Sequence, residues 1–148
     1  MQNFNQQLVA LTMATLRADG KADATEIEVI KRVAADLECP ADETARLMLE
    51  EHEKQANRPD MQAYIADVAK TVINPEDRQL IMEACVQVAL ADKKLTTQEV
   101  DVLLMVCHAL QCNLSVLVCN IAIVTQNDRD IKIEGSDADF TEEYIEEN

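Results

Sequence analysis

Two segments of this 148-residue chain, 18–39 and 91–112, match one another without a gap along their whole length. Eight of the 22 aligned positions are identical, whereas unrelated segments would share roughly one or two. Such a duplication predicts a fold built from two similar units. The identical residues are Ala18, Asp19, Lys21, Glu26, Val29, Val33, Leu37 and Cys39, which align with Ala91, Asp92, Lys94, Glu99, Val102, Val106, Leu110 and Cys112.

The first copy has the pattern of consecutive helices. Apolar residues recur at helical spacing over 4–16, and Gly20 suits the turn that follows because glycine readily adopts a left-handed backbone. Asp23, with Glu26 three residues later, is typical of the start of a second helix. Pro40 marks the end of that helix.

The second copy repeats this pattern with its own signals. Pro75 suits the first turn of a helix that runs to a turn near Asp92. Thr96 and Glu99 then predict a capping box, in which each side chain bonds the backbone of the other residue.

Further helices are expected at about 41–56, 60–73 and 114–126. The last is apolar on nearly every side, so we expect it to be the central helix, wrapped by the others. Aromatic residues make up only 3% of the chain, and two glycines and three prolines leave little material for hairpins. The sequence therefore predicts an all-α, compact bundle of about seven helices built from two similar helical repeats.

The predicted organisation is one helical domain at 1–126, with repeats at about 4–56 and 76–126 joined by a linking helix at about 60–73. An acidic C-terminal tail follows it.

The tail, residues 127–148, holds nine acidic and two basic residues, a composition typical of a disordered segment. An interaction segment is the alternative, because Phe140, Tyr144 and Ile145 recur at helical spacing and would suit docking on a partner or on the domain itself.

The formal net charge of −15 disfavours nucleic acids and anionic membranes as partners, because both bind basic surfaces. Cations and basic protein surfaces are favoured instead, and the sequence does not identify a protein partner. The apolar run at 114–124 is too short to span a bilayer, and residues 1–7 lack the basic residues of a secretory signal. We expect a cytoplasmic protein with no direct membrane insertion.

The five cysteines include no CxxC pair and do not suggest a disulfide framework. Cys107, His108 and Cys112 are close enough in sequence to consider zinc, but no fourth ligand is indicated nearby. We interpret these cysteines as small buried hydrophobic residues.

Acidic residues are repeated around the duplicated turn. On a helical projection Glu26 and Glu99 border the apolar stripes of their helices, whereas Glu28 faces solvent. Asp19 precedes Glu26 by seven residues, and Asp92 precedes Glu99 in the same way.

Two units related by a rough two-fold would bring Asp19, Glu26, Asp92 and Glu99 towards one locus. Carboxylates held close together repel one another unless a cation intervenes, and oxygen ligands without His or Cys favour Ca²⁺, Mg²⁺ or Mn²⁺. Turn and cap structure alone is the alternative, because acidic residues in a first helical turn also favour the helix dipole. Capping accounts less well for Asp19 and Asp92.

The segments "RADGKADATEIEVIKRVAADL" and "LADKKLTTQEVDVLLMVCHAL" resemble the TerB-like family associated with tellurite resistance, over roughly residues 4–126. The resemblance implies a seven-helix bundle and metal binding through the acidic positions Asp19, Glu26, Asp92 and Glu99. It also implies a role in stress responses to metals, phage and tellurite, often within membrane-associated complexes. Lys93 replaces the family's glycine in the second copy, which weakens that half of the site.

The sequence features bear on three classes of function. The first is a cation-binding stress-response domain with a divalent cation as its ligand. The second is a protein-interaction module that uses no metal and acts through the tail or an acidic helix containing Glu50, Glu51 and Glu53. An enzyme is disfavoured, because His52 and Glu53 open a metalloprotease-like motif in which Ala56 stands where the second histidine is required.

Overall fold

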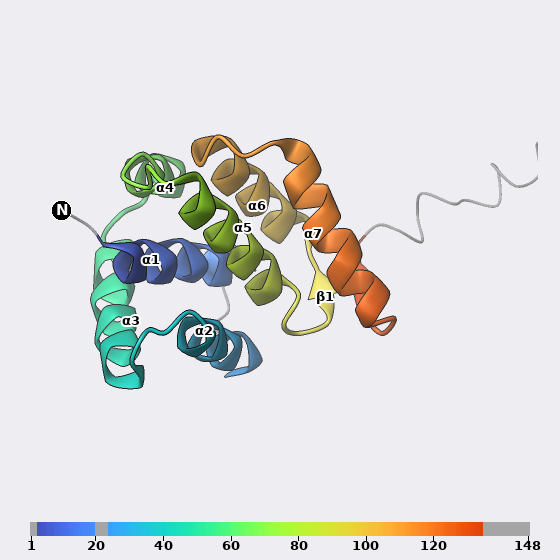
Figure 1. Ribbon diagram of the computed structural model, residues 1–148, viewed down its shortest axis with the longest axis horizontal. Helices are drawn as coiled ribbons and strands as arrows, with labels where there is room; N and C mark the ends of the chain where they lie inside the picture. The colour runs from blue at the N-terminus through green and yellow to red at the C-terminus, as the bar shows by residue number, and fades with distance from the viewer. Residues whose placement is uncertain (1–2, 20–23, 135–148) are drawn as a thin grey trace, which may run out of the picture.

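The computed structural model describes residues 3–19 and 24–134, and these residues form seven α-helices with very little strand (Figure 1). The predicted all-α bundle is therefore confirmed. In chain order the elements are α1 (Phe4–Leu16), the short 3-10 helix η1 (Arg17–Asp19), α2 (Ala24–Asp36), α3 (Ala41–Ala56), α4 (Met61–Ala69), α5 (Pro75–Ala89), β1 (Lys94–Leu95), α6 (Thr97–Ala109), α7 (Leu114–Asn127) and β2 (Lys132–Ile133).

The duplication is visible in the helix bounds. Helices α2 and α6 begin and end at aligned positions of the two copies, α3 and α7 begin at aligned positions, and α1 and α5 end at aligned positions. The backbone repeats as well, because Glu38 and Gln111 both adopt positive φ after their helices. In each copy the next amide closes the helix end on a carbonyl five residues earlier, as Cys39 does on Ala34 at 2.8 Å.

The two copies pack around a central pair of helices, α1 and α5. Helices α2 and α3 flank α1, while α6 and α7 flank α5 in the corresponding way, and α3 and α7 lie at opposite edges of the molecule (Figure 1). Helix α4 joins the copies and packs on α1 and α6. The repeated sequence thus produces a repeated set of helix contacts.

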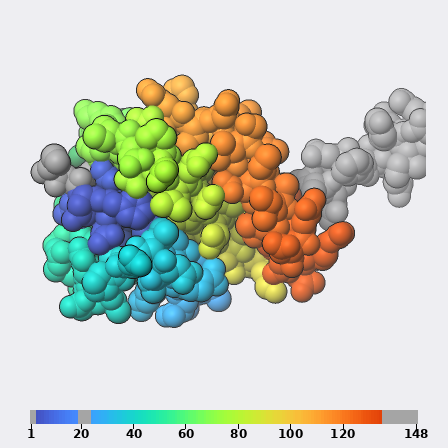
Figure 2. Space-filling view, viewed as in Figure 1, coloured from blue at the N-terminus to red at the C-terminus, as the bar shows by residue number. Residues whose placement is uncertain are grey.

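Helix α7 is not central, and that prediction is wrong. Of its residues only Leu117 is buried, whereas ten residues of α1, from Gln7 to Leu16, are buried. Both helices lack charged residues, so hydrophobicity alone does not distinguish them. The position of α7 at the edge of the bundle, seen in Figure 2, decides its exposure.

Buried hydroxyls in α1 are satisfied within the helix itself. Thr12 donates to the carbonyl of Leu8 at 2.7 Å, and Thr15 donates to the carbonyl of Leu11 at 3.0 Å. These bonds let polar side chains lie in the centre of the bundle without the cost of an unmade hydrogen bond.

The chain after α7 returns to the repeated turn. Strand β2 pairs in parallel with β1, and the amide of Lys132 donates to the carbonyl of Lys93 at 2.9 Å. Ile131 packs against the core, so the first part of the predicted acidic tail is folded onto the domain. Phe140, Tyr144 and Ile145 lie outside the described residues.

None of the helices in the described part of the chain combines the length and the apolar character that crossing a bilayer requires.

Candidate functional site

The second repeated turn uses Asp92 structurally. Its Oδ1 accepts a hydrogen bond from the backbone amide of Lys94 at 3.1 Å, and Lys93 between them has a φ of 62°. The backbone here takes the left-handed conformation although the residue is lysine and not glycine, the residue at the matching position of the first copy. Asp92 is half-buried and holds this turn together.

Glu99 is completely buried, with 0% of its surface exposed. Its Oε1 accepts hydrogen bonds from the amide and the hydroxyl of Thr96, at 2.9 and 3.0 Å. The Thr96 hydroxyl in turn accepts from the amide of Glu99 at 3.1 Å. The predicted capping box is confirmed, and it explains how this carboxylate is accommodated in the protein interior.

Glu26 occupies the matching place in the first copy and is also 0% exposed. Glu28 is exposed and lies 3.7 Å from Lys31, so the predicted orientation of this helix is confirmed. Asp23 and the side chain of Asp19 lie outside the described residues. The repeat therefore places a wholly buried glutamate in the first turn of both α2 and α6.

The four predicted metal ligands are only partly described, so the shared site stays a prediction. Among the described residues, no group of three or more His, Cys, Asp or Glu side chains is arranged to hold a metal ion. Asp92 and Glu99 each have a structural role in the second copy. A test of the shared site therefore has to address Asp19 in the first copy.

Lys93 directs its ammonium away from the turn that it belongs to. The Nζ atom lies 3.2 Å from Asp128 and 3.9 Å from Asp130, both in the loop after α7. The pKa of Asp128 is lowered, first by a hydrogen bond from the backbone of Asp130 and then by Lys93. The ion pairs attach the end of the described chain to the repeated turn.

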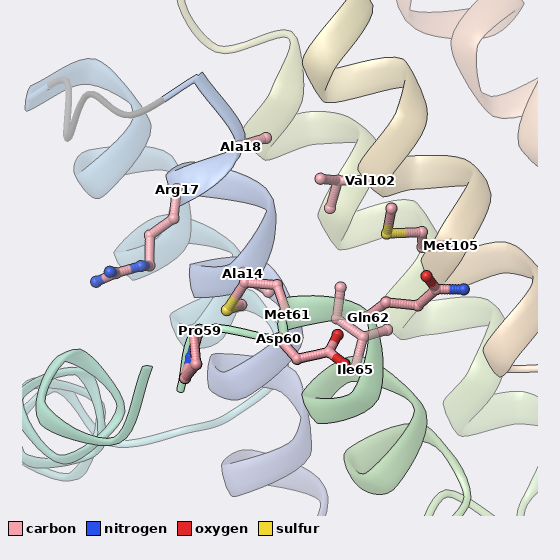
Figure 3. A pocket seen from close by; sticks show the side chains of 10 residues that line it. All are labelled: Ala14, Arg17, Ala18, Pro59, Asp60, Met61, Gln62, Ile65, Val102 and Met105. Atoms are coloured by element: carbon pink, nitrogen blue, oxygen red, sulfur yellow. The ribbon is translucent and has the colours of Figure 1, made fainter. Parts of the chain in front are cut away.

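A hollow of about 570 Å³ opens beside the first repeated turn and was not predicted from the sequence. Figure 3 shows residues from three parts of the chain around it, with Arg17 extending away from Val102 and Met105. No sequence motif signals this hollow, because its wall is assembled from distant segments. The lining comprises Ala14, Arg17, Ala18, Pro59, Asp60, Met61, Gln62, Ile65, Val102 and Met105.

Cys107 and Cys112 lie in apolar surroundings, as interpreted from the sequence. The thiol of Cys107 donates to the carbonyl of Cys112 at 3.5 Å, and burial raises the pKa of both thiols. His108 is exposed. All five cysteines lie in the described residues and are free thiols, with Cys119 exposed.

Helix α3 is the acidic helix that was predicted to contact a partner. Its Glu51 is not available on the surface as that prediction requires. This side chain is only 3% exposed, and its Oε2 accepts hydrogen bonds from the Tyr64 hydroxyl and from Gln55 Nε2. Gln55 also donates to the carbonyl of Ala10 at 3.0 Å, so the cluster joins α3, α4 and α1. Burial, followed by the bond to Glu51, raises the pKa of Tyr64.

Other acidic side chains of α3 form ion pairs with a basic side chain of the same helix. Arg46 lies 2.8 Å from Glu50 and 4.0 Å from Glu43, which leaves Glu53 as an exposed carboxylate near the C-terminal end of α3. His52 is also exposed. Helix α3 therefore offers fewer available carboxylates than its sequence indicates.

Comparison with known families identifies one match. The model of the family described as tellurite resistance protein TerB matches residues 5–116, about three quarters of the chain. Neither the curated proteins nor the solved structures include a match to this chain. The matched region extends from the second residue of α1 to the first turn of α7 and contains both repeated turns.

Proposed function

The chain belongs to the family of tellurite resistance protein TerB, and we propose that it is a non-enzymatic domain that binds a divalent cation in a response to metal or tellurite stress. Ca²⁺, Mg²⁺ and Mn²⁺ are the candidate ions, because the repeated acidic positions supply oxygen ligands only. We further propose a cytoplasmic location. The predicted ligands are Asp19 and Glu26 in the first copy and Asp92 and Glu99 in the second.

The burial of a repeated glutamate is the observation that supports cation binding. Glu26 and Glu99 are both 0% exposed in a chain of high negative charge. A carboxylate is costly to remove from water unless hydrogen bonds or a positive charge compensate it. In the second copy the hydroxyl and amide of Thr96 supply such hydrogen bonds to Glu99.

The first copy differs from the second in ways that favour a cation. Asp23 stands at the position of Thr96, so a second acidic residue replaces a neutral hydroxyl. Three acidic residues, Asp19, Asp23 and Glu26, thus fall within eight positions of the first copy. We assign the stronger cation site to this copy.

Thermal unfolding with and without added cation tests the assignment, because a ligand that binds the folded state raises the midpoint. With a Kd of about 1 mM, about 10 mM Mg²⁺, Ca²⁺ or Mn²⁺ adds about 1.4 kcal/mol. For a chain of this size that is a rise of about 3–6 °C. NaCl at matched ionic strength serves as the control for screening.

The repeat supplies a matched pair of variants, Asp19→Asn and Asp92→Asn. Asparagine keeps an Oδ1 acceptor, so the bond from Lys94 to position 92 is preserved in the second variant. We expect Asp19→Asn to abolish the shift in midpoint and Asp92→Asn to retain most of it. Absence of any shift in the unmodified chain would refute cation binding. Equal loss in both variants would instead indicate one site shared by the four carboxylates.

An interaction module without metal is the other function that a specific observation favours. Helix α7 carries three exposed apolar side chains, Leu114, Val118 and Ile123. Exposed apolar side chains gathered on one helix are typical of a contact surface. Helix α7 is thus a stronger candidate for a protein contact than α3, whose carboxylates are partly buried or paired.

A further inference from the structure

The C-terminal end of α6 brings two cysteines together. The amide of Cys112 donates to the carbonyl of Cys107 at 3.0 Å, and Gln111, with its positive φ, turns the chain back over the helix. In this type of helix end the side chains of the two bonded residues commonly contact one another. The Cys107 thiol accordingly lies 3.5 Å from the carbonyl oxygen of Cys112. Backbones bonded in this way have Cα atoms about 5–6 Å apart, which is a separation that a disulfide spans.

The first copy has the same backbone without the pair of thiols. The amide of Cys39 donates to the carbonyl of Ala34 at 2.8 Å, and Glu38 adopts the positive φ. Ala34 stands at the position of Cys107, and the Cys39 sulfur instead accepts a hydrogen bond from the Thr44 hydroxyl at 3.1 Å. Alanine is therefore sufficient for the packing of this helix end, and the pair of thiols is specific to the second copy.

The two thiols differ in their access to solvent. Cys112 is half-buried and lines a hollow of about 240 Å³, whereas Cys107 is only 3% exposed. This hollow lies where the connection from α6 to α7 meets the start of α5 (Figure 1). Arg78 also lines it, and its guanidinium opposes the rise in the pKa of Cys112 that burial and the neighbouring Cys107 cause. A small oxidant that enters the hollow therefore meets Cys112 first.

We propose that Cys112 and Cys107 form a peroxide-sensitive dithiol, in which Cys112 is oxidised first and Cys107 then closes a disulfide. The Cys112 sulfur attacks a hydroperoxide, ROOH, so that an S–O bond forms, the O–O bond breaks and the alcohol ROH leaves with the thiol proton. Cys107 then attacks the sulfenic sulfur, and the sulfenic oxygen leaves as water with the proton of Cys107. The two thiols together lose two electrons, and the hydroperoxide gains them.

Oxidation at this place has a local structural consequence. The Cys107 thiol donates to the carbonyls of Cys112 and Asn113, at 3.5 and 3.7 Å, and a disulfide replaces these weak bonds by a covalent link between the end of α6 and the start of α7. At the proposed cytoplasmic location glutathione restores the dithiol, so the link is transient. Glu99 lies in the first turn of α6 and Cys107 in its last turn, so this site is separate from the proposed cation site.

Alkylation followed by peptide mapping of the full chain tests the proposal. Trypsin releases residues 95–129 as one peptide with three cysteines, so the assay uses a Cys119→Ser background, in which only Cys107 and Cys112 remain in that peptide. The reduced chain is treated with hydrogen peroxide, quenched with catalase, unfolded and alkylated. We expect the peptide to lose two hydrogen atoms and to carry no alkyl group, while the separate peptide of Cys39 stays alkylated. Dithiothreitol added before alkylation should restore both alkylated thiols.

Two alanine variants in the same background identify the roles of the thiols. Cys107→Ala copies the residue of the first copy, Ala34, and should form no disulfide. Its Cys112 should instead carry an adduct of dimedone, which traps a sulfenic acid that no second thiol consumes. Cys39→Ala is the matched control and should form the disulfide as before. Circular dichroism checks that each variant is folded.

Three results would overturn the proposal. The first is that peroxide leaves Cys107 and Cys112 as open to alkylation as in the untreated chain, or oxidises Cys39 to the same extent. The second is that the linked cysteines come from two chains, seen as two joined peptides. The third is that Cys107→Ala gives no dimedone adduct at Cys112.

Discussion

Glu38 and Gln111 adopt the same left-handed backbone, with φ of 67° and 56°, at equivalent positions of the two copies. Each follows the C-terminus of a 13-residue helix, α2 or α6, and turns the chain towards the next helix. A residue with a Cβ atom is disfavoured in this conformation, and glycine is not. Each copy therefore has one strained helix end, and the two lie at equivalent positions.

Relief of this strain should stabilise the protein. We expect Glu38→Gly and Gln111→Gly each to raise the free energy of unfolding by about 0.5–1 kcal/mol, because the folded-state gain exceeds the added entropy of the unfolded chain. Urea unfolding followed by circular dichroism measures the change. Ala35→Gly, at an exposed position in the last turn of α2, should lower stability, by up to about 1 kcal/mol. If glycine changed stability in the same direction at position 35 as at positions 38 and 111, backbone strain would not be the explanation.

The hydrogen bond from Tyr64 to Glu51 should contribute strongly to stability. Tyr64→Phe keeps the ring, which contacts the Arg58 guanidinium at 5.1 Å, but removes the hydroxyl donor from a carboxylate that is almost fully buried. We expect a loss of about 1–3 kcal/mol in urea unfolding. His52→Ala, next to Glu51 but exposed, should change stability by less than about 0.5 kcal/mol. A neutral effect of Tyr64→Phe would show that the bond is dispensable.

Alkaline pH should destabilise the fold through Cys85. Burial raises the pKa of this thiol to about 12 from an ordinary value of 9.0. Between these values the unfolded chain releases the proton and the folded chain keeps it, so the free energy of unfolding falls as pH rises. One such group contributes up to about 1.4 kcal/mol per pH unit. Urea titrations from about pH 8 to pH 11 measure the slope. Cys85→Ala should reduce it, whereas Cys119→Ser, at an exposed thiol, should not.

The segment after α7 should belong to the folded unit. A chain ending at residue 127 loses the pairing of β2 with β1, the ion pair of Lys93 with Asp128 and the packing of Ile131. A chain ending at residue 134 keeps all three and serves as the reference. We expect the shorter chain to be less stable by about 1–3 kcal/mol in thermal unfolding. Equal midpoints would show that the pairing contributes nothing.

Local signals were sufficient to predict most helices. Pro75 begins α5 and Thr96 caps α6, because each acts through its own backbone and immediate neighbours. Helical periodicity, likewise a local property, placed Glu26 and Glu99 at the border of their apolar stripes, although it did not predict that both are completely buried.

Features that depend on tertiary contact were not predictable in this way. The burial of Glu51 requires Tyr64 from another helix, and the strand pair joins residues 94–95 to 132–133 without any alternating pattern. The exposure of α7 was missed because an apolar sequence does not indicate whether its own chain covers it. At the candidate site the sequence predicted the capping box of Thr96 and Glu99, whereas the cation site itself stays a prediction.

The packing of α1 on α5 makes the two copies depend on one another for a complete core. Each long helix completes its core with the other, so a chain cut within α4 would yield halves that each expose an apolar side. Such halves should reassociate. A single copy would bury its apolar side only by pairing with a second molecule of the same copy. The polypeptide therefore carries the architecture of a homodimer within one chain. We therefore expect the two copies to unfold together. A substitution that destabilises one copy should destabilise the whole domain.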